Sequence, residues 1–106
     1  MNCIFCKIIK GEIPAQKVFE NENVIVFHDL FPKAPVHVLV IPKKHIESLA
    51  HLTPTDTTLM GEMTLLLQDI AKQLNLHEGF KIAVNTGKKG GQEVFHLHYH
   101  LMGSPQ

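Results

Sequence analysis

Arginine and tryptophan are absent from this 106-residue chain, and its ten lysines are balanced by ten acidic residues. A net charge of zero excludes the strongly basic surface typical of proteins that bind nucleic acid or anionic membranes. Because no guanidinium group is available, any bound phosphate must be held by histidine, lysine, side-chain amides or backbone N–H groups.

Long apolar runs are also absent. No segment approaches the roughly 20 apolar residues that span a bilayer, and the N-terminus is too short and too mixed for a secretory signal. We therefore expect a cytoplasmic protein that binds neither membrane nor nucleic acid. In that compartment the two cysteines, Cys3 and Cys6, are expected to be reduced thiols or metal ligands rather than a disulfide.

The hydrophobic pattern predicts a single α+β domain over residues 1–106. A long helix is expected to begin near Thr53, with Pro54 at its first position, Asp56 completing a capping-box pattern and an apolar stripe that continues to Leu74. A short helix is expected over residues 4–10. Five strands are expected over residues 16–20, 24–30, 36–41, 80–85 and 94–102. Because strands and helices do not alternate regularly, the sheet is expected to be mostly antiparallel.

The last of these segments carries three of the eight histidines, His96, His98 and His100. Successive side chains on a strand point to opposite faces, so the three imidazoles are expected to share one face. The alternate residues are expected to face the core: Phe95, Leu97, Tyr99 and Leu101. Three adjacent imidazoles must be solvated, hydrogen-bonded or bound to a metal.

Three interpretations of the histidine face are open at this point: a solvated polar face, a catalytic metal site and a phosphate site. The preceding loop, Gly90-Gly91-Gln92, favours phosphate, because glycine lets backbone N–H groups approach an anion closely. Such a loop is a weak signal alone. Its position directly before a histidine-bearing segment gives it weight.

Residues 96–102 match the signature His-φ-His-φ-His-φ-φ, in which φ is apolar, and other segments extend the match over nearly the whole chain. These segments are Ile4 to Ile9, Glu12-Ile13-Pro14, Phe27-His28-Asp29, Ala34 to His45, Val84-Asn85 and Gly90-Gly91-Gln92. In these motifs the chain resembles the histidine triad (HIT) superfamily, and within it the Hint branch. The resemblance implies a HIT-like fold, with a five-stranded, mostly antiparallel sheet, one long helix and one short helix.

The resemblance implies a catalytic group of four histidines: His37, His96, His98 and His100. Within it, His98 matches the nucleophile. A backbone carbonyl that accepts from Nδ1–H would fix its tautomer and leave Nε2 to attack phosphorus. His100 and His37 match positions that donate hydrogen bonds to the phosphate oxygens. His96 also matches a metal ligand.

The nucleotide positions are likewise implied by the resemblance. Asp29 matches a carboxylate that accepts from the ribose hydroxyls. The slot around the purine is matched by Phe5, Ile13, Phe27, His28 and Leu30. The phosphate and leaving-group side is matched by Asn85 and by the backbone of Gly91, Gln92 and Glu93. Glu93 departs from the serine of many Hint proteins, and a carboxylate donates to a leaving amine only when it is protonated.

Cys3 and Cys6 form a Cys-x-x-Cys half-site, which needs two further ligands to hold tetrahedral zinc. The resemblance to HIT proteins with this pair implies a structural zinc ion bound by Cys3, Cys6, His45 and His96, with no catalytic cofactor. The alternative is two buried, reduced thiols in the first helix.

The function implied by the resemblance is cleavage of purine nucleoside 5′-phosphoramidates, or of acyl-adenylates, to a nucleoside monophosphate such as AMP. The reaction would pass through a covalent nucleotidyl-histidine. Two alternatives are hydrolysis of dinucleoside polyphosphates, as in the Fhit branch, and a nucleotide-binding or interaction module with incidental turnover. The glutamine-bearing pattern and longer loops of the Fhit branch are not found in this sequence. A homodimer is also implied.

Overall fold

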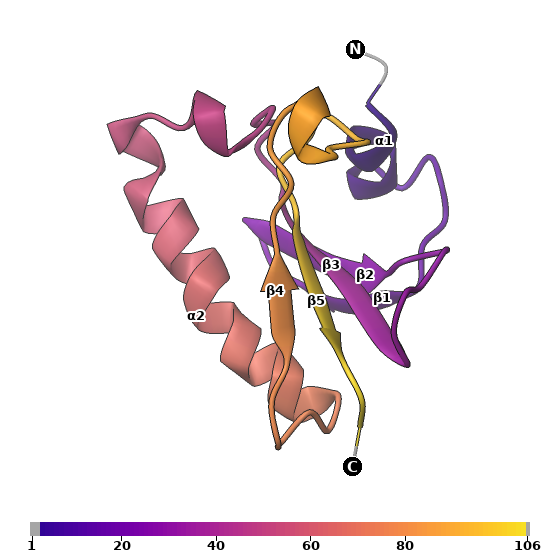
Figure 1. Ribbon diagram of the computed structural model, residues 1–106. Coiled ribbons are helices and arrows are strands. Elements are labelled where there is room, and N and C mark those ends of the chain that lie inside the picture. The colour runs from indigo at the N-terminus through magenta and orange to yellow at the C-terminus, as the bar shows by residue number, and fades with distance from the viewer. Residues whose placement is uncertain (1–2, 106) are drawn as a thin grey trace.

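The computed structural model describes residues 3–105 as a five-stranded antiparallel sheet with a helix on each face (Figure 1). In the order β1-β2-β3-β5-β4, the strands are β1 (Lys17–Glu20), β2 (Val24–His28), β3 (Val36–Pro42), β5 (Tyr99–Gly103) and β4 (Lys81–Ala83). The helices are α1 (Ile4–Ile9) and α2 (Thr57–Gln73). The α+β class and the antiparallel sheet expected from the sequence are confirmed. Within residues 3–105, no helix has both the length and the apolar character needed to cross a membrane.

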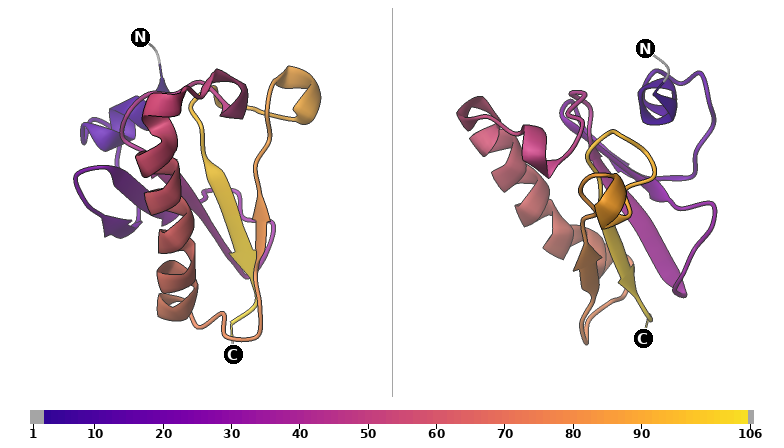
Figure 2. Two further views of the ribbon diagram at one scale, coloured as in Figure 1. Left: turned by 90° about the vertical axis from the view of Figure 1, so that its left-hand side faces the viewer. Right: turned by 45° about the horizontal axis from the view of Figure 1, so that its top comes forward.

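The central strands β2 and β3 are buried on both faces, which explains why their sequences are almost continuously apolar. Alternate residues pack to opposite sides: Val24 and Val26 belong to the core under α2, and Ile25 and Phe27 to the smaller core under α1. Figure 2 shows the two helices on opposite sides of the sheet. Because α1 has only six residues, it covers part of its face and leaves room there for a cleft.

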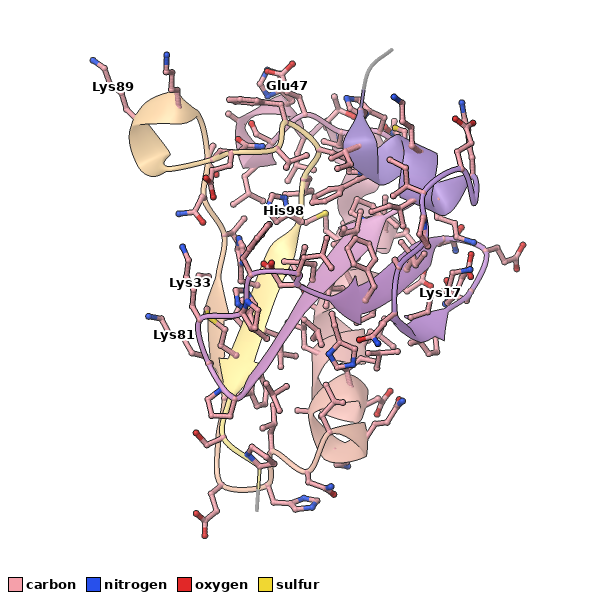
Figure 3. The ribbon with its side chains drawn as sticks, turned by 90° about the vertical axis from the view of Figure 1, so that its right-hand side faces the viewer. Lys17, Lys33, Glu47, Lys81, Lys89 and His98 are labelled. Carbon is pink, nitrogen blue, oxygen red and sulfur yellow. The ribbon has the colours of Figure 1, made fainter. Side chains whose placement is uncertain are left out.

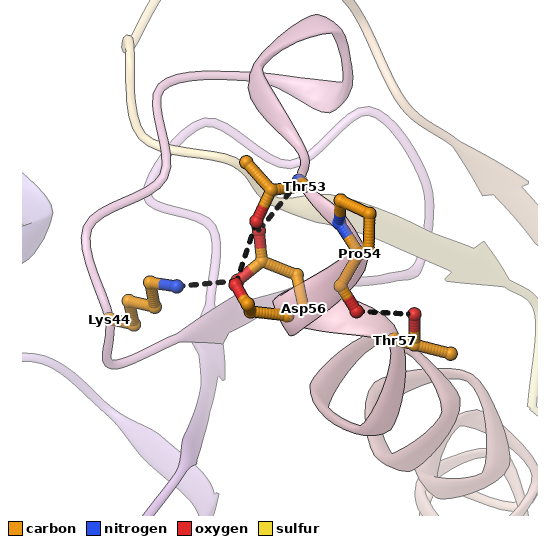
Figure 4. A network of polar contacts seen from close by, with 6 residues as sticks. Lys44, Thr53, Pro54, Asp56 and Thr57 are labelled. Carbon is orange, nitrogen blue, oxygen red and sulfur yellow. Dashed lines mark hydrogen bonds and ion pairs between the residues drawn. The ribbon is translucent and has the colours of Figure 1, made fainter.

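The long helix begins as the sequence predicts. The Asp56 carboxylate accepts from the Thr53 N–H at 3.0 Å and pairs with the Lys44 ammonium (Figure 4). Pro54 starts a short 3-10 turn that runs directly into α2. The apolar stripe expected from the periodicity is buried at Met63, Leu67, Ile70 and Ala71.

Replacing Asp56 by alanine is expected to lower the Tm at pH 7 by several degrees, because the variant loses the helix cap and leaves Lys44 unpaired. The hydrogen bond from Lys44 holds the pKa of the Asp56 carboxyl below its ordinary value of 3.8. The stabilisation is therefore present above pH 3.8 and is lost as the pH falls through the lower folded-state pKa. Thermal melts of Asp56→Ala and of Asp69→Ala, an exposed acid on α2, measure the effect. Equal Tm values at pH 7 would contradict it.

The strand expected over residues 94–102 is wrong in its first half. β5 begins only at Tyr99. The residues before it approach the segment after β3, where the Leu97 N–H donates to the Ile46 carbonyl at 2.6 Å. Phe95 is 44% exposed instead of lying in the core. Only the last of the three histidines therefore lies within the strand.

Candidate active site

A cleft of about 590 Å³ lies on the α1 side of the sheet. Apolar side chains of α1, the segment after it and the sheet line one part of the cleft: Ile4, Phe5, Ile8, Ile13, Phe27 and Leu39. Polar groups line another part: Asn85, Gly91, Glu93, His98 and His100. The loop after β2 contributes residues 29–31 and 33 to the lining. Figure 3 shows His98 near the centre of this face, with Lys33 in the bordering loop.

His98 is buried beside the cleft, with one ring nitrogen fixed by the backbone. Its Nδ1 lies 2.7 Å from the His96 carbonyl oxygen, which can only accept, so Nδ1 carries the proton and donates it. The Nε2 lone pair is then free. Phe5 packs edge-to-face against the ring, with centroids 5.1 Å apart. Burial lowers the pKa of His98, so its imidazole is neutral at pH 7 and can act as a nucleophile.

His37 and His100 form a hydrogen-bonded pair whose direction is set by the backbone. The Lys33 N–H donates to His37 Nδ1 at 3.0 Å, so the proton of neutral His37 is on Nε2. His37 Nε2 donates to His100 Nδ1 at 2.9 Å and lies 3.4 Å from an Asp29 oxygen. His100 therefore keeps its own proton on Nε2, where it can donate to a bound phosphate.

Asp29, His37 and His100 also bring three potential metal-ligand atoms within 4.8 Å of one another. A metal on His37 Nε2 requires the proton of the neutral ring to be on Nδ1. The Lys33 N–H already donates to Nδ1 and needs a lone pair there. The geometry therefore favours the hydrogen-bonded pair over a catalytic metal.

The position of His100 leads to an expected titration. Burial, together with the rings of His98 and His37, lowers the pKa of His100 to about 4 from its ordinary value of 6.5. NMR of the ring protons, assigned by comparison with His100→Gln, is expected to show a midpoint near that lower value. Because the unfolded chain takes up this proton first, His100 reduces stability as the pH falls from 6.5 to about 4 and has no such effect above 6.5. A folded-state midpoint of 6.5 would mean that the ring is solvated.

The N–H groups of the glycine loop are hydrogen-bonded within the loop. The N–H groups of Gly90, Gly91 and Gln92 donate to the carbonyls of Gly87 and Lys88 at 3.0 to 3.1 Å. These hydrogen bonds close the loop on itself. A role of the Gly91 and Gln92 backbone beside a bound anion stays a prediction.

The Gln92 side chain is turned inward. Its amide donates to the Glu47 and Val94 carbonyls at 2.7 and 3.0 Å, and its oxygen accepts from the Gly87 N–H at 2.8 Å. Gln92 thus ties the loop to the segment after β3. Within residues 3–105, the N–H groups of Glu93 and Val94, both at the cleft, form no hydrogen bond and are among the free backbone donors there.

Gly91 requires glycine for two reasons. Its φ is 88°, in the left-handed region, and an added Cβ would lie 3.3 Å from Asn85 Nδ2. The missing side chain therefore lets the loop close on Asn85 at the polar part of the cleft.

A second cluster, outside the cleft lining, joins Cys3, Cys6, His45 and His96. The two Nδ1 atoms are 3.1 Å apart, and the sulfur-to-nitrogen distances are 3.3, 3.4 and 3.6 Å. Tetrahedral zinc with ordinary bond lengths separates its ligands by about 3.3 Å for two nitrogens and about 3.6 Å for nitrogen and sulfur. The four residues therefore fit a zinc ion. Burial raises the pKa of the Cys6 thiol, so a bound metal must displace its proton.

His96 is fully buried, and both its ring nitrogens are engaged. Nε2 donates to the Pro42 carbonyl at 2.7 Å, while Nδ1 faces the sulfurs of Cys3 and Cys6. A carbonyl that accepts from the outer nitrogen is a common support for a metal-ligating histidine. The His96 ring thus belongs to the Cys3–Cys6–His45 cluster and does not line the cleft with His98 and His100. The backbone carbonyl of His96, and not its ring, accepts the hydrogen bond from His98 Nδ1.

The HIT domain family model matches residues 10–106. The chain belongs to the HIT family. It is 56% identical to protein HitA of Neisseria gonorrhoeae, over 98% of this chain and 97% of that protein. A HIT family hydrolase from Legionella pneumophila superposes with a TM-score of 0.95 at 43% identity, covering 99% of this chain and 95% of that one. A histidine triad nucleotide-binding protein from Candida albicans superposes with a TM-score of 0.89 at 35% identity, covering 99% and 76%.

Most positions singled out by the resemblance to HIT proteins line the cleft: Phe5, Ile13, Phe27, His28, Asp29, Leu30, Asn85, Gly91, Glu93, His98 and His100. Three of the catalytic and nucleotide positions lie outside the lining: Gln92, His96 and His37, the last of which is hydrogen-bonded to His100. The zinc positions Cys3, Cys6 and His45 also lie outside it. The sequence analysis missed Phe31 and Lys33, which also line the cleft. Their only signal in the sequence is that they follow Asp29 in the same loop.

Proposed function

We propose that this HIT-family protein is a hydrolase that cleaves purine nucleoside 5′-phosphoramidates, or acyl-adenylates, through a covalent nucleotidyl-His98. The observation that carries the proposal is the hydrogen bond from His98 Nδ1 to the His96 carbonyl, which leaves a neutral Nε2 at the cleft. Two relatives support the reaction class, since one is named a hydrolase and the other a nucleotide-binding protein.

In the first step His98 Nε2 attacks phosphorus, and the P–N bond breaks with its electron pair leaving on nitrogen, which takes up a proton from solvent as it departs. The phosphate would lie where His100 Nε2–H and the free N–H groups of Glu93 and Val94 donate to its oxygens. In the second step water attacks phosphorus and the bond to Nε2 breaks. Overall, water supplies a hydroxyl group to phosphorus and a proton to the leaving amine, and His98 returns to its neutral form.

Asp29 would accept from the ribose hydroxyls, and the base would occupy the apolar part of the cleft. One Asp29 oxygen accepts from the Phe31 N–H at 2.8 Å, and the other lies 3.4 Å from His37 Nε2. Both oxygens are therefore oriented before a substrate binds, which reduces the entropy lost on binding.

Glu93 bears on the choice of leaving group. It lines the cleft, so an ionised carboxylate there attracts an amine that departs with positive charge and repels a departing carboxylate. This electrostatic preference favours phosphoramidates over acyl-adenylates.

The test is a turnover panel of adenosine and guanosine phosphoramidates, an acyl-adenylate and a dinucleoside polyphosphate, with wild type and Glu93→Gln. We expect the phosphoramidates to be cleaved fastest. In Glu93→Gln, the ratio of phosphoramidate cleavage to acyl-adenylate cleavage should be smaller than in the wild type. Faster cleavage of the dinucleoside polyphosphate would favour an Fhit-like activity. AMP binding without turnover of any substrate would overturn the proposal in favour of a binding module.

We also propose that Cys3, Cys6, His45 and His96 hold a structural zinc ion. The cluster joins the start of α1 to the segment that carries His98 and has no residue in the cleft lining. The metal would therefore support the site without contacting substrate.

A homodimer is our third proposal. β4 lies at an edge of the sheet, and Leu65 on α2 is 67% exposed. Pairing of two β4 edges would cover unpaired backbone groups and continue the sheet across a two-fold axis. Light scattering is expected to give the mass of two chains, and a monomer at micromolar concentration would contradict this arrangement.

A further inference from the structure

Two adjacent apolar side chains project from the loop after β2. Leu30 is 85% exposed and Phe31 is 82% exposed, the highest values among the large apolar residues in the described part of the chain. Both line the cleft. Two large apolar side chains this exposed, consecutive in sequence and at the same cleft, indicate a binding surface.

The backbone holds this loop in place, so the exposure does not come from a loose segment. The Asp29 N–H donates to the His37 carbonyl at 3.0 Å, and the Phe31 N–H donates back to an Asp29 carboxylate oxygen at 2.8 Å. The Lys33 N–H donates to His37 Nδ1 at 3.0 Å. Phe31 is therefore held out at the cleft before any ligand arrives, which lowers the entropic cost of a contact made there.

Two further aromatic rings line the cleft. Phe5 and Phe27 meet edge-to-face with centroids 5.8 Å apart, and Ile4 of α1 is 46% exposed at the same cleft. Asp29 directly precedes Leu30 in the same loop, and one of its carboxylate oxygens lies 3.4 Å from His37 Nε2. A nucleotide with its phosphate at His98 and its ribose at Asp29 would have its base in the cleft that Phe31 also lines.

We propose that Phe31 is a specificity-determining residue that stacks on the outer face of the substrate's nucleobase. This inference rests on the proposed function and extends it to a residue outside the HIT motifs of the sequence. The occupant is a base and not a protein, because Phe31 lines the same cleft as the nucleophile and its backbone is bonded to the proposed ribose ligand. An aromatic ring gives a base more stacking area and better geometry than an aliphatic side chain.

The experiment compares Phe31→Ala, Phe31→Leu and Phe31→Trp on two substrates, adenosine 5′-phosphoramidate and ribose 5-phosphoramidate, which has no base. Stacking on an aromatic side chain is worth about 1–3 kcal/mol per base, so the ratio of the two kcat/KM values is expected to fall roughly 10-fold in Phe31→Ala. The change should lie mainly in KM, as expected for lost ground-state binding. Phe31→Leu should recover little of the ratio and Phe31→Trp most of it.

The control is Phe80→Ala, which removes another exposed ring (42%) outside the cleft lining and should keep the wild-type ratio. Dissociation constants of AMP and ribose 5-phosphate are measured on the same proteins, so the role of Phe31 is decided even if the phosphoramidates are not turned over. An unchanged ratio in Phe31→Ala, in both turnover and binding, would overturn the inference. So would an equal loss for the ligands with and without a base.

Discussion

Substitution of His98 by alanine is expected to lower kcat for adenosine phosphoramidate by at least about 10⁴-fold, because the variant lacks the Nε2 that forms the bond to phosphorus. The His98 ring is not part of the Cys3–Cys6–His45–His96 cluster, so metal content should be retained. Circular dichroism and AMP binding verify that the variant is folded.

A graded comparison separates the nucleophile from the phosphate donor. His100→Gln keeps His98 but replaces the Nε2–H that donates to phosphate, and is expected to cost about 10²- to 10³-fold in kcat. Near-wild-type turnover by folded His98→Ala would mean that another group attacks phosphorus. An equal loss in the two variants would remove the basis for distinguishing their roles.

Loss of the Cys/His cluster is expected to have the largest effect on stability. Protein purified without added zinc should contain about one zinc ion per chain, and Cys6→Ala should contain far less. The six-residue helix α1 is too short to be stable by itself, and its N-cap residue is Cys3 of the cluster. A loss of about 3 kcal/mol would lower the Tm of a chain this small by more than about 10 °C.

His96→Ala and His98→Ala form a matched pair for this prediction. The two histidines are close in sequence and both buried, but only His96 faces the cysteines. His96→Ala should therefore lose zinc and stability, while His98→Ala loses turnover and keeps zinc. A wild-type protein that folds normally with far less than one zinc per chain would instead favour two buried, reduced thiols.

Much of the fold could be predicted from residues that are close together in the sequence. The capping pattern at Thr53, Pro54 and Asp56 and the apolar stripe behind it locate α2, because a helix is determined by neighbours three and four residues apart. The segment before Tyr99 could not be predicted in this way. It leaves the sheet because Leu97 bonds to Ile46, a contact between residues far apart in sequence.

In the candidate site, too, some features could be predicted from the sequence and others depend on contacts between distant residues. The types of residue at the cleft follow from the HIT motifs, but their protonation depends on contacts that the motifs do not contain. The Lys33 N–H directs the proton of His37, and the His96 carbonyl directs that of His98. The sequence places Gln92 in a loop predicted to bind an anion. In the structure, its side-chain amide instead donates to the carbonyls of Glu47 and Val94.

The central claim is that His98 forms a covalent bond to the phosphorus of the substrate. Rapid acid-free quenching of the reaction with adenosine phosphoramidate, followed by digestion and mass spectrometry, tests it directly. We expect one nucleoside monophosphate on the peptide that contains His98, appearing and decaying fast enough to account for turnover, and absent in His98→Ala. Full turnover with no adduct at any time point, or with an adduct on another residue, would contradict the mechanism.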